Sequence, residues 1–179
     1  MTRAAAWLVA VLLSCGSASA QVAEPPGYRE DQYRGPVPET LAGATVVDTE
    51  EALRLWEAGD TVFIDVLPRA PKPSNLPAGT IWREKQRLSI PGALWLVNTG
   101  YGKIAPETDT YFRSGLAVAT DGNADHPVLF FCLEECWMSW NAARRAVEYG
   151  YTHVFWYPDG TDGWAFDDHP LEPLEPWVQ

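Results

Sequence analysis

Hydrophobic runs alternate with amphipathic segments along most of the chain. Short stretches that are rich in apolar residues occur at 44–47, 61–66, 93–97, 128–131 and 153–157. Continuous runs of this kind are typical of strands that are covered on both faces. Segments with helical periodicity lie at 49–58, 109–119 and 137–149. Because strands alternate with helices, the pattern predicts an α/β domain whose doubly wound, mostly parallel sheet is flanked by helices.

Capping residues mark the ends of two of these helices. Asp48 and Thr49 can cap the first helix, and Gly59 follows its last turn. Gly150 is a suitable stop for the helix that follows the 128–131 strand. Gly115, in contrast, lies inside the 109–119 helix and counts against that assignment.

The first 20 residues have the pattern of an export signal. Arg3 supplies a positive charge, 4–13 is apolar, and Ala18-Ser19-Ala20 forms an A-x-A cleavage site. The apolar stretch is too short to cross a bilayer as a stable helix. We therefore expect a periplasmic protein with no transmembrane segment in the mature chain. Lipoprotein anchoring through Cys15 is the less favoured alternative, because Leu13 is bulky for that pattern.

The remaining chain divides into three parts. Residues 21–41 are rich in Pro, Gly and charge, which predicts an extended arm that can lie on the domain. Residues 42–170 form the expected domain, and 171–179 an acidic, Pro-rich tail. Within the domain, 67–87 is a long, proline-marked loop, and loops of this length are commonly functional or insertions. A loop is also expected at 158–164.

Two cysteines remain after removal of the signal. Cys132 and Cys136 would then lie in an oxidising compartment, as a disulfide or as a dithiol served by partners. Cys132 follows a buried strand and precedes a helix, and the N–H groups of a helix start favour anions and lower a thiol pKa. Asp65 and the loop after Tyr157 should lie at the same carboxyl edge of the sheet, where ligands bind in such folds.

The net charge of −11 argues against nucleic acid and anionic membrane surfaces as partners. No spacing of His, Cys or acidic residues requires a metal. Four aspartates near the C-terminus could supply oxygen ligands to calcium, although Asp is equally common in turns. They are Asp159, Asp162, Asp167 and Asp168. Arg144 and Arg145 fall on the polar helix face, where we expect them to be solvated.

Four short pieces occur in a fixed order along the chain. They are Phe63-Ile64-Asp65-Val66, Ile90-Pro91-Gly92-Ala93, Cys132 ahead of a helix that closes on Gly150-Tyr151, and Gly160-Thr161-Asp162-Gly163-Trp164. In this order they resemble a single rhodanese-like domain over about 44–164. The resemblance implies a doubly wound sheet in which Cys132 is a thiol that can carry a persulfide.

A narrower resemblance involves Cys132 to Trp137 together with Trp156 to Trp164. These stretches are similar to an exported family named for a CxxCW motif and associated with pyrroloquinoline-quinone-dependent alcohol catabolism. Here three residues, not two, separate the cysteines. That resemblance implies a periplasmic accessory role, with the quinone as an indirect association and no cofactor assigned to this chain.

The cysteine loop departs from working sulfurtransferases and from related phosphatases. Leu133, Glu134 and Glu135 stand where the sulfurtransferase loop usually carries Gly and Arg, and Leu67 replaces an arginine after the Asp-Val strand. The two carboxylates oppose a thiolate and would repel anionic donors such as thiosulfate. Met138 occupies the place of the phosphatase arginine, so nothing would clamp a phosphoryl group.

These observations leave two functions open. In the first, Cys132 is the nucleophile or sulfur carrier and Cys136 the resolving thiol, in a redox or sulfur-transfer accessory with a thiol-redox partner. The loop N–H groups that would bind the anion belong to Leu133, Glu134, Glu135, Trp137 and Met138. The alternative for this cysteine pair is a permanent disulfide that only fixes the loop and takes no part in catalysis.

In the second, the chain is a non-enzymatic module that binds a periplasmic quinoprotein dehydrogenase, or its quinone, through an aromatic rim. The rim would consist of Trp137, Trp140, Tyr157 and Trp164. Ordinary packing in helix and sheet is the favoured explanation of the same four aromatic residues, because Trp is readily buried. Asp65 would support the loop as a hydrogen-bond acceptor, or less simply act in catalysis.

Overall fold

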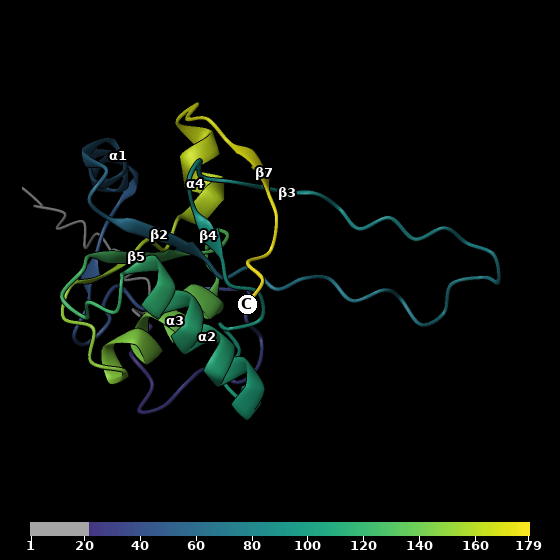
Figure 1. The fold of residues 1–179 in the computed structure, drawn as a ribbon, viewed down its shortest axis with the longest axis horizontal. Coiled ribbons are helices and arrows are strands. Elements are labelled where there is room, and N and C mark those ends of the chain that lie inside the picture. The colour runs from purple at the N-terminus through teal and green to yellow at the C-terminus, as the bar shows by residue number, and fades with distance from the viewer. Residues whose placement is uncertain (1–21) are drawn as a thin grey trace, which may run out of the picture.

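The computed structural model describes residues 22–179 and shows a five-stranded parallel sheet between two layers of helices (Figure 1). The strand order is β1-β6-β5-β2-β4. These strands are β1 (Thr45–Val46), β2 (Val62–Asp65), β4 (Leu94–Trp95), β5 (Val128–Phe131) and β6 (Val154–Trp156). The predicted doubly wound α/β architecture is confirmed. The expected export signal and Cys15 lie outside the described residues.

Helices α1 (Thr49–Ala58) and α4 (Gly160–Phe166) cover one face of the sheet, and α2 (Pro106–Ala119) and α3 (Trp137–Glu148) cover the other (Figure 1). Side chains of β5 alternate between the two layers, as the pleat of a strand requires. Val128 and Phe130 pack with α2 and α3, whereas Leu129 and Phe131 pack with α1 and α4. Among residues 22–179, no helix is long and apolar enough to cross a bilayer.

The capping predictions hold for α1. Asp48 Oδ1 accepts the Glu51 N–H at 2.9 Å, and Gly59 adopts a left-handed conformation with a φ of 74°. Helix α2 starts three residues earlier than expected, with Pro106 in its first turn. Gly115 is required there by packing, because a Cβ at this position would lie 2.5 Å from Leu96 Cδ2.

Two segments near the C-terminus differ from expectation. Residues 160–166, expected in a loop, form α4. The expected tail contains β7 (Glu172–Leu174), which pairs antiparallel with β3 (Arg87–Ser89) in a separate two-stranded sheet. Strands of three residues are too short to show a period, so only the pairing across the chain reveals them. Trp177 packs beyond β7 against Tyr111, with ring centroids 5.2 Å apart.

Residues 68–86 leave the domain as a long excursion without helix or strand (Figure 1). The prolines predicted a loop here, but they did not predict that it extends away from the domain. It departs after β2 and returns into β3, so its base lies at the carboxyl edge of the sheet.

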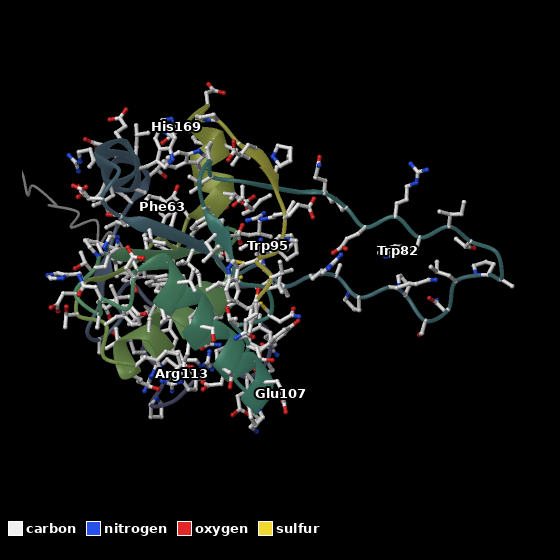
Figure 2. All side chains as sticks on the ribbon, in the orientation of Figure 1. Phe63, Trp82, Trp95, Glu107, Arg113 and His169 are labelled. Carbon is white, nitrogen blue, oxygen red and sulfur yellow. The ribbon has the colours of Figure 1, made fainter. Side chains whose placement is uncertain are left out.

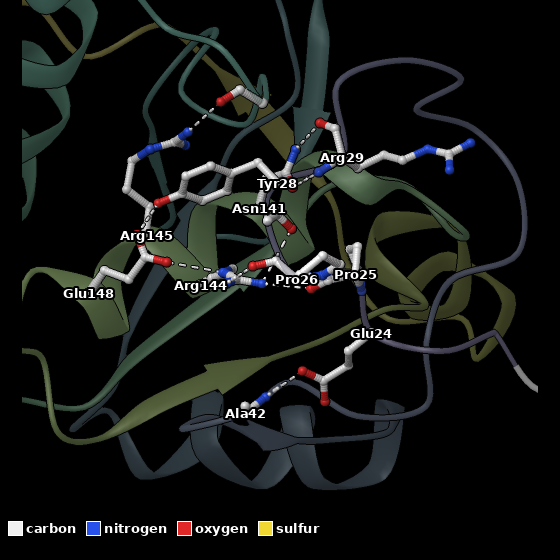
Figure 3. Close-up of polar contacts among 12 residues, drawn as sticks. Glu24, Pro25, Pro26, Tyr28, Arg29, Ala42, Asn141, Arg144, Arg145 and Glu148 are labelled. Atoms are coloured by element: carbon white, nitrogen blue, oxygen red, sulfur yellow. Dashed lines mark hydrogen bonds and ion pairs between the residues drawn. The ribbon is translucent and has the colours of Figure 1, made fainter.

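The N-terminal segment lies on α3 as an extended strap, which we define as residues 22–41 (Figure 3). Arg144 donates to the carbonyls of Pro25, Pro26 and Gly27 at 2.9, 2.9 and 3.2 Å. Asn141 bonds both the N–H and the carbonyl of Arg29, at 2.9 and 2.8 Å. The expected extended arm is therefore present, and it is fixed to the domain.

The strap and a neighbouring loop change the environment of the polar face of α3. Arg145, expected to be solvated, is only 4% exposed, and it donates to the carbonyls of Thr99, Tyr101 and Gly102 at 2.8 to 3.1 Å. Arg144 is also partly covered, by the strap. The expectation of solvated arginines was wrong, because a polar helix face can also serve backbone carbonyls of segments that pack across it.

Candidate functional site

The two cysteines meet between β5 and α3. Cys132 follows the last residue of β5, and Cys136 is the residue that precedes the first turn of α3. Their Sγ atoms are 2.7 Å apart, and both are free thiols. The sequence placed these residues at a strand end and a helix start, and it expected the sulfurs to be within reach of one another. Both placements are confirmed.

The first thiol, however, is not accessible. Cys132 is 0% exposed and Cys136 is 2% exposed. Cys132 lies in the same buried cluster as Val66 and Phe130 of the sheet. The sequence made Cys132 the nucleophile or sulfur carrier, a role that requires an accessible sulfur. Because the sulfur follows a strand of the central sheet, packing on that strand covers it.

The 160–164 motif holds the cysteine loop. Thr161 donates its backbone N–H to the Cys132 carbonyl at 3.1 Å, and Asp162 Oδ2 accepts the Glu134 N–H at 3.0 Å. Gly160 has a φ of 54° and leaves no room for a side chain, since a Cβ would lie 2.7 Å from the Cys132 carbonyl oxygen. The turn therefore fits closely against the loop.

Asp65 is a structural acceptor at the base of the site. Its carboxylate accepts the Leu67 N–H at 2.9 Å, the Ser89 hydroxyl at 2.6 Å and Arg87 Nε at 2.7 Å. The Asp65 and Arg87 side chains are 0% and 7% exposed. Arg87 Nη2 also lies 3.4 Å from the Cys132 carbonyl oxygen. This arrangement supports the structural interpretation of Asp65.

Sequence reasoning missed Arg87. The expected arginine position directly after Val66 holds Leu67, and the cation comes instead from β3, across the long excursion. The only sequence signal was its place at the start of a short stretch leading to Ile90, and that pattern does not show which carboxylate it meets.

The loop N–H groups do not form the open anion site that was expected. Those of Glu134 and Trp137 donate to Asp162 Oδ2 and to the Tyr33 carbonyl, at 3.0 and 2.9 Å. Those of Leu133 and Met138 face the Cys136 sulfur. Glu135 has a φ of 49° and its side chain is exposed. The N–H groups of Leu133 and Met138 can therefore stabilise a thiolate on Cys136.

The strap closes the site from outside. Arg34 pairs with Cys136 as an isolated antiparallel bridge, and the Gly35 N–H donates to the Glu135 carbonyl at 3.0 Å. Trp137 Nε1 donates to the Pro36 carbonyl at 3.1 Å. Residues 33–36 thus run across the cysteine loop as an added strand and account for the burial of Cys136.

The surroundings of the two sulfurs separate their pKa values. Burial raises the pKa of Cys132 well above its ordinary value, and the hydrogen bond with Cys136 and the charge of Asp65 act in the same direction. The hydrogen bond with Cys132 lowers the pKa of Cys136 to about 7 against the effect of burial, helped by the N–H groups of Met138 and Leu133 and by Arg34. The sequence interpretation made Cys132 the nucleophile, whereas these contacts favour the thiolate on Cys136.

We predict that loosening the strap exposes Cys136. Arg144→Ala removes hydrogen bonds from a guanidinium to three strap carbonyls, a loss of about 1 kcal/mol in a partly solvated setting. Alkylation of Cys136 by iodoacetamide, followed by mass spectrometry, should then be about fivefold faster. Arg54→Ala is the control, since Arg54 pairs with Glu50 and Glu51 on α1, which covers the opposite face of the sheet from the strap. Equal rates in both variants would show that the strap does not limit access.

The aromatic rim is not an exposed surface. Trp137 and Trp140 pack together on α3 with centroids 5.5 Å apart, while Tyr157 and Trp164 lie in the cluster on the opposite face of the sheet. All four are at most 4% exposed. Ordinary packing accounts for them, and they offer no stacking platform for a quinone.

Two hollows adjoin the cysteine loop. A groove of about 640 Å³ lies between the strap, the end of β1 and the loop after β6, and Glu134 and Glu135 form part of its wall. A second cavity of about 360 Å³ is lined by Leu133, Thr161 and Arg87, at the base of the excursion. In the described part of the chain, no group of three or more His, Cys, Asp or Glu side chains could hold a metal ion, so the four aspartates do not assemble a calcium site.

Comparison with known proteins is informative at the level of the fold. No protein-family model matches the chain, and no curated protein matches it. A thiosulfate sulfurtransferase structure from Pseudomonas aeruginosa is similar, with a TM-score of 0.50 and 17% identity over 74% of this chain. The chain spans only 21% of that structure's length.

Two other solved structures are similar. EanB in complex with ergothioneine gives a TM-score of 0.50 and 18% identity over 80% of this chain and 34% of its own. The polysulfide-sulfur transferase of Wolinella succinogenes has a TM-score of 0.46 and 17% sequence identity, and the match covers 73% of this chain and 80% of that protein. Together with the sheet order and the position of Cys132, the similarity shows that this chain adopts the rhodanese-like fold of the sulfurtransferases.

Proposed function

We propose that the chain is a thiol–disulfide exchange protein in which Cys136 attacks and Cys132 resolves. The observation that carries this proposal is the pair of free sulfurs 2.7 Å apart at the start of α3. A rhodanese-type sulfur carrier requires one cysteine, and the second thiol within the same loop adds a partner that can close a disulfide.

The exchange proceeds in two displacements. The Cys136 thiolate attacks one sulfur of a partner disulfide, which forms a mixed disulfide and releases the first partner thiolate. Cys132 then loses its proton to that leaving thiolate and attacks Cys136 Sγ. A Cys132–Cys136 disulfide forms, the second partner sulfur leaves, and two partner thiols have been produced from one disulfide. The surroundings suit this order, because Cys136 ionises first and Cys132 keeps its proton until the second step.

The charge of the loop supports a partner disulfide over an anionic sulfur donor. Glu134 and Glu135 flank the pair, and Asp159 and Asp162 lie close by on the next turn. The pKa of Asp159 is raised by burial and by the carboxylates of Glu134, Asp48 and Asp167. A donor such as thiosulfate would meet this repulsion before it reached the sulfurs.

We further propose a periplasmic setting, with a quinoprotein dehydrogenase system or a thiol-redox protein as the partner. The export pattern of the first 20 residues and the similarity of the Cys132–Trp137 stretch to the CxxCW family support this setting. Pyrroloquinoline quinone would belong to the partner, and this chain would act on thiols as an accessory.

The pH dependence of alkylation tests the proposal. Because a thiolate is the reactive form and the pKa of Cys136 is about 7, the rate at Cys136 should rise through pH 7 and level off near pH 8. Cys132 should remain unmodified across that range, since burial raises its pKa. Stopped alkylation with mass spectrometry of each cysteine measures both profiles.

Two results would count against exchange chemistry. A Cys132–Cys136 disulfide that mild dithiothreitol does not reduce would leave only a pinned loop. A persulfide found on either cysteine after incubation with a sulfane-sulfur donor would instead favour sulfur transfer, the activity associated with this fold. Thiol counting before and after reductant distinguishes these outcomes.

A further inference from the structure

The excursion of residues 68–86 is the most exposed feature of the molecule. It extends away from the domain, and Trp82 lies between its two arms (Figure 2). Trp82 is 38% exposed and Ile81 is 82% exposed. An out-and-back loop of this length reaches about 30 Å at full extension. Exposed large apolar side chains on a projecting loop are typical of a contact surface.

The excursion is basic on an acidic protein. Four of its residues are Lys or Arg and one is Glu, within a chain of net charge −11. Arg69 and Glu84 pair with each other near its base. Lys72, Arg83 and Lys85 have no ion pair or hydrogen bond with any other residue of 22–179. The excursion therefore presents three uncompensated positive charges beside Ile81 and Trp82.

A surface of the opposite character lies beside the cysteine loop. The groove of about 640 Å³ has walls of Val and Pro side chains from the strap, β1 and the loop after β6. Its charged lining residues are Glu39, Asp48, Glu134, Glu135 and Asp159. No Lys or Arg of the described chain lines it. The groove therefore combines an apolar floor with a strongly negative rim.

We propose that the excursion of one copy of this chain docks in the acidic groove of a second copy. The three cations match the carboxylate rim, and Ile81 and Trp82 match the Val and Pro walls. The volume of the groove exceeds that of a Trp side chain several-fold. An excursion that points away from its own domain meets another molecule more readily than its own groove (Figure 1).

This docking would place the partner copy's excursion against Glu134, Glu135 and the strap, directly outside the thiols. Nucleic acid and anionic membranes fit the excursion alone, but the acidity of the whole chain opposes both. A second copy of the chain provides a complementary surface for both the basic excursion and the acidic groove. The contact is electrostatic in large part, so it should weaken as salt is added.

Sedimentation velocity of the purified chain over a concentration series tests the proposal. We expect self-association with a Kd in the micromolar range at low salt, weakened at least about tenfold at 0.5 M salt. Lys72→Glu/Lys85→Glu should abolish it, and Trp82→Ser should weaken it about tenfold. Adding Glu39→Lys/Glu134→Lys/Glu135→Lys to the charge-reversed excursion should restore association, because the lining of the groove then carries a net charge of +1 and the excursion one of −1.

Arg54→Glu/Arg113→Glu is the matched control, since it changes the net charge equally at two exposed sites, on α1 and α2, that line neither surface. This variant should associate like the parent chain. A parent chain that is monomeric at all concentrations and low salt overturns the proposal. So does equal loss of association in the control pair, or a five-substitution rescue variant that circular dichroism shows to be folded and that stays monomeric. Binding only to anionic vesicles or to nucleic acid also overturns it.

Discussion

Cys136→Ser is expected to reduce thiol–disulfide exchange to the uncatalysed level, a loss of about a hundredfold or more. The serine hydroxyl does not ionise near neutral pH, so the attacking thiolate is removed. Cys132 cannot replace it, because burial among the side chains of the sheet raises its pKa and blocks access to its sulfur. Reduction of a small aromatic disulfide, followed by the absorbance of the released thiol, measures the rate.

Cys132→Ser should behave differently from Cys136→Ser. The Cys136 thiolate still attacks, so one equivalent of partner thiol is released, but the resolving sulfur is missing and the mixed disulfide accumulates. Mass spectrometry of the intact chain would detect it. Should Cys132→Ser lose the attack, and Cys136→Ser instead trap the mixed disulfide, the two roles are reversed and Cys132 is the nucleophile. The fold of both variants can be checked by the same unfolding transition.

The second large effect concerns stability. Asp65→Asn leaves the Arg87 guanidinium buried without its carboxylate, and breaking a buried pair in this way costs about 3–5 kcal/mol. The effect should be large because Asp65 also accepts bonds from Ser89 and from the Leu67 N–H. Urea unfolding followed by Trp fluorescence gives the change in the free energy of unfolding.

Two further variants test whether the unpaired charge of Arg87 causes the destabilisation. Asp65→Asn/Arg87→Met removes both charges and should recover part of the loss, since an apolar side chain needs no partner. Glu84→Ala breaks the exposed pair with Arg69 and should leave the free energy of unfolding nearly unchanged, because solvent screens that pair. A double variant as unstable as Asp65→Asn alone would show that the charge of Arg87 is not what destabilises the single variant.

Much of the fold follows from local pattern. The apolar run from Val128 to Phe131 identified the central strand with its bounds, and Asp48 and Gly59 bounded α1 as expected. The position of Cys132 after that strand, and of Cys136 at the next helix start, placed both sulfurs at one edge. These features depend on residues close in sequence, where periodicity and capping act directly.

The covering of the site depends on contacts between distant residues. Asn141 meets Arg29 across 112 positions, and Trp137 meets Pro36 across 101. Nothing in the pattern of 21–41 shows which helix an extended arm will follow, because such a segment has no periodic face of its own. The sequence therefore predicted the arm and the thiols separately.

What the sequence alone determined is the α/β framework, the strand-end cysteine and its second thiol four residues on. Only the tertiary structure decided which thiol ionises, because that depends on Arg34 from the strap, on the N–H groups that face each sulfur and on burial by the sheet. It also decided that Arg87 neutralises Asp65 and that α4 and β7 form. Each of these results depends on contacts between segments that are far apart in the sequence. Local sequence patterns do not show which distant segments will be in contact.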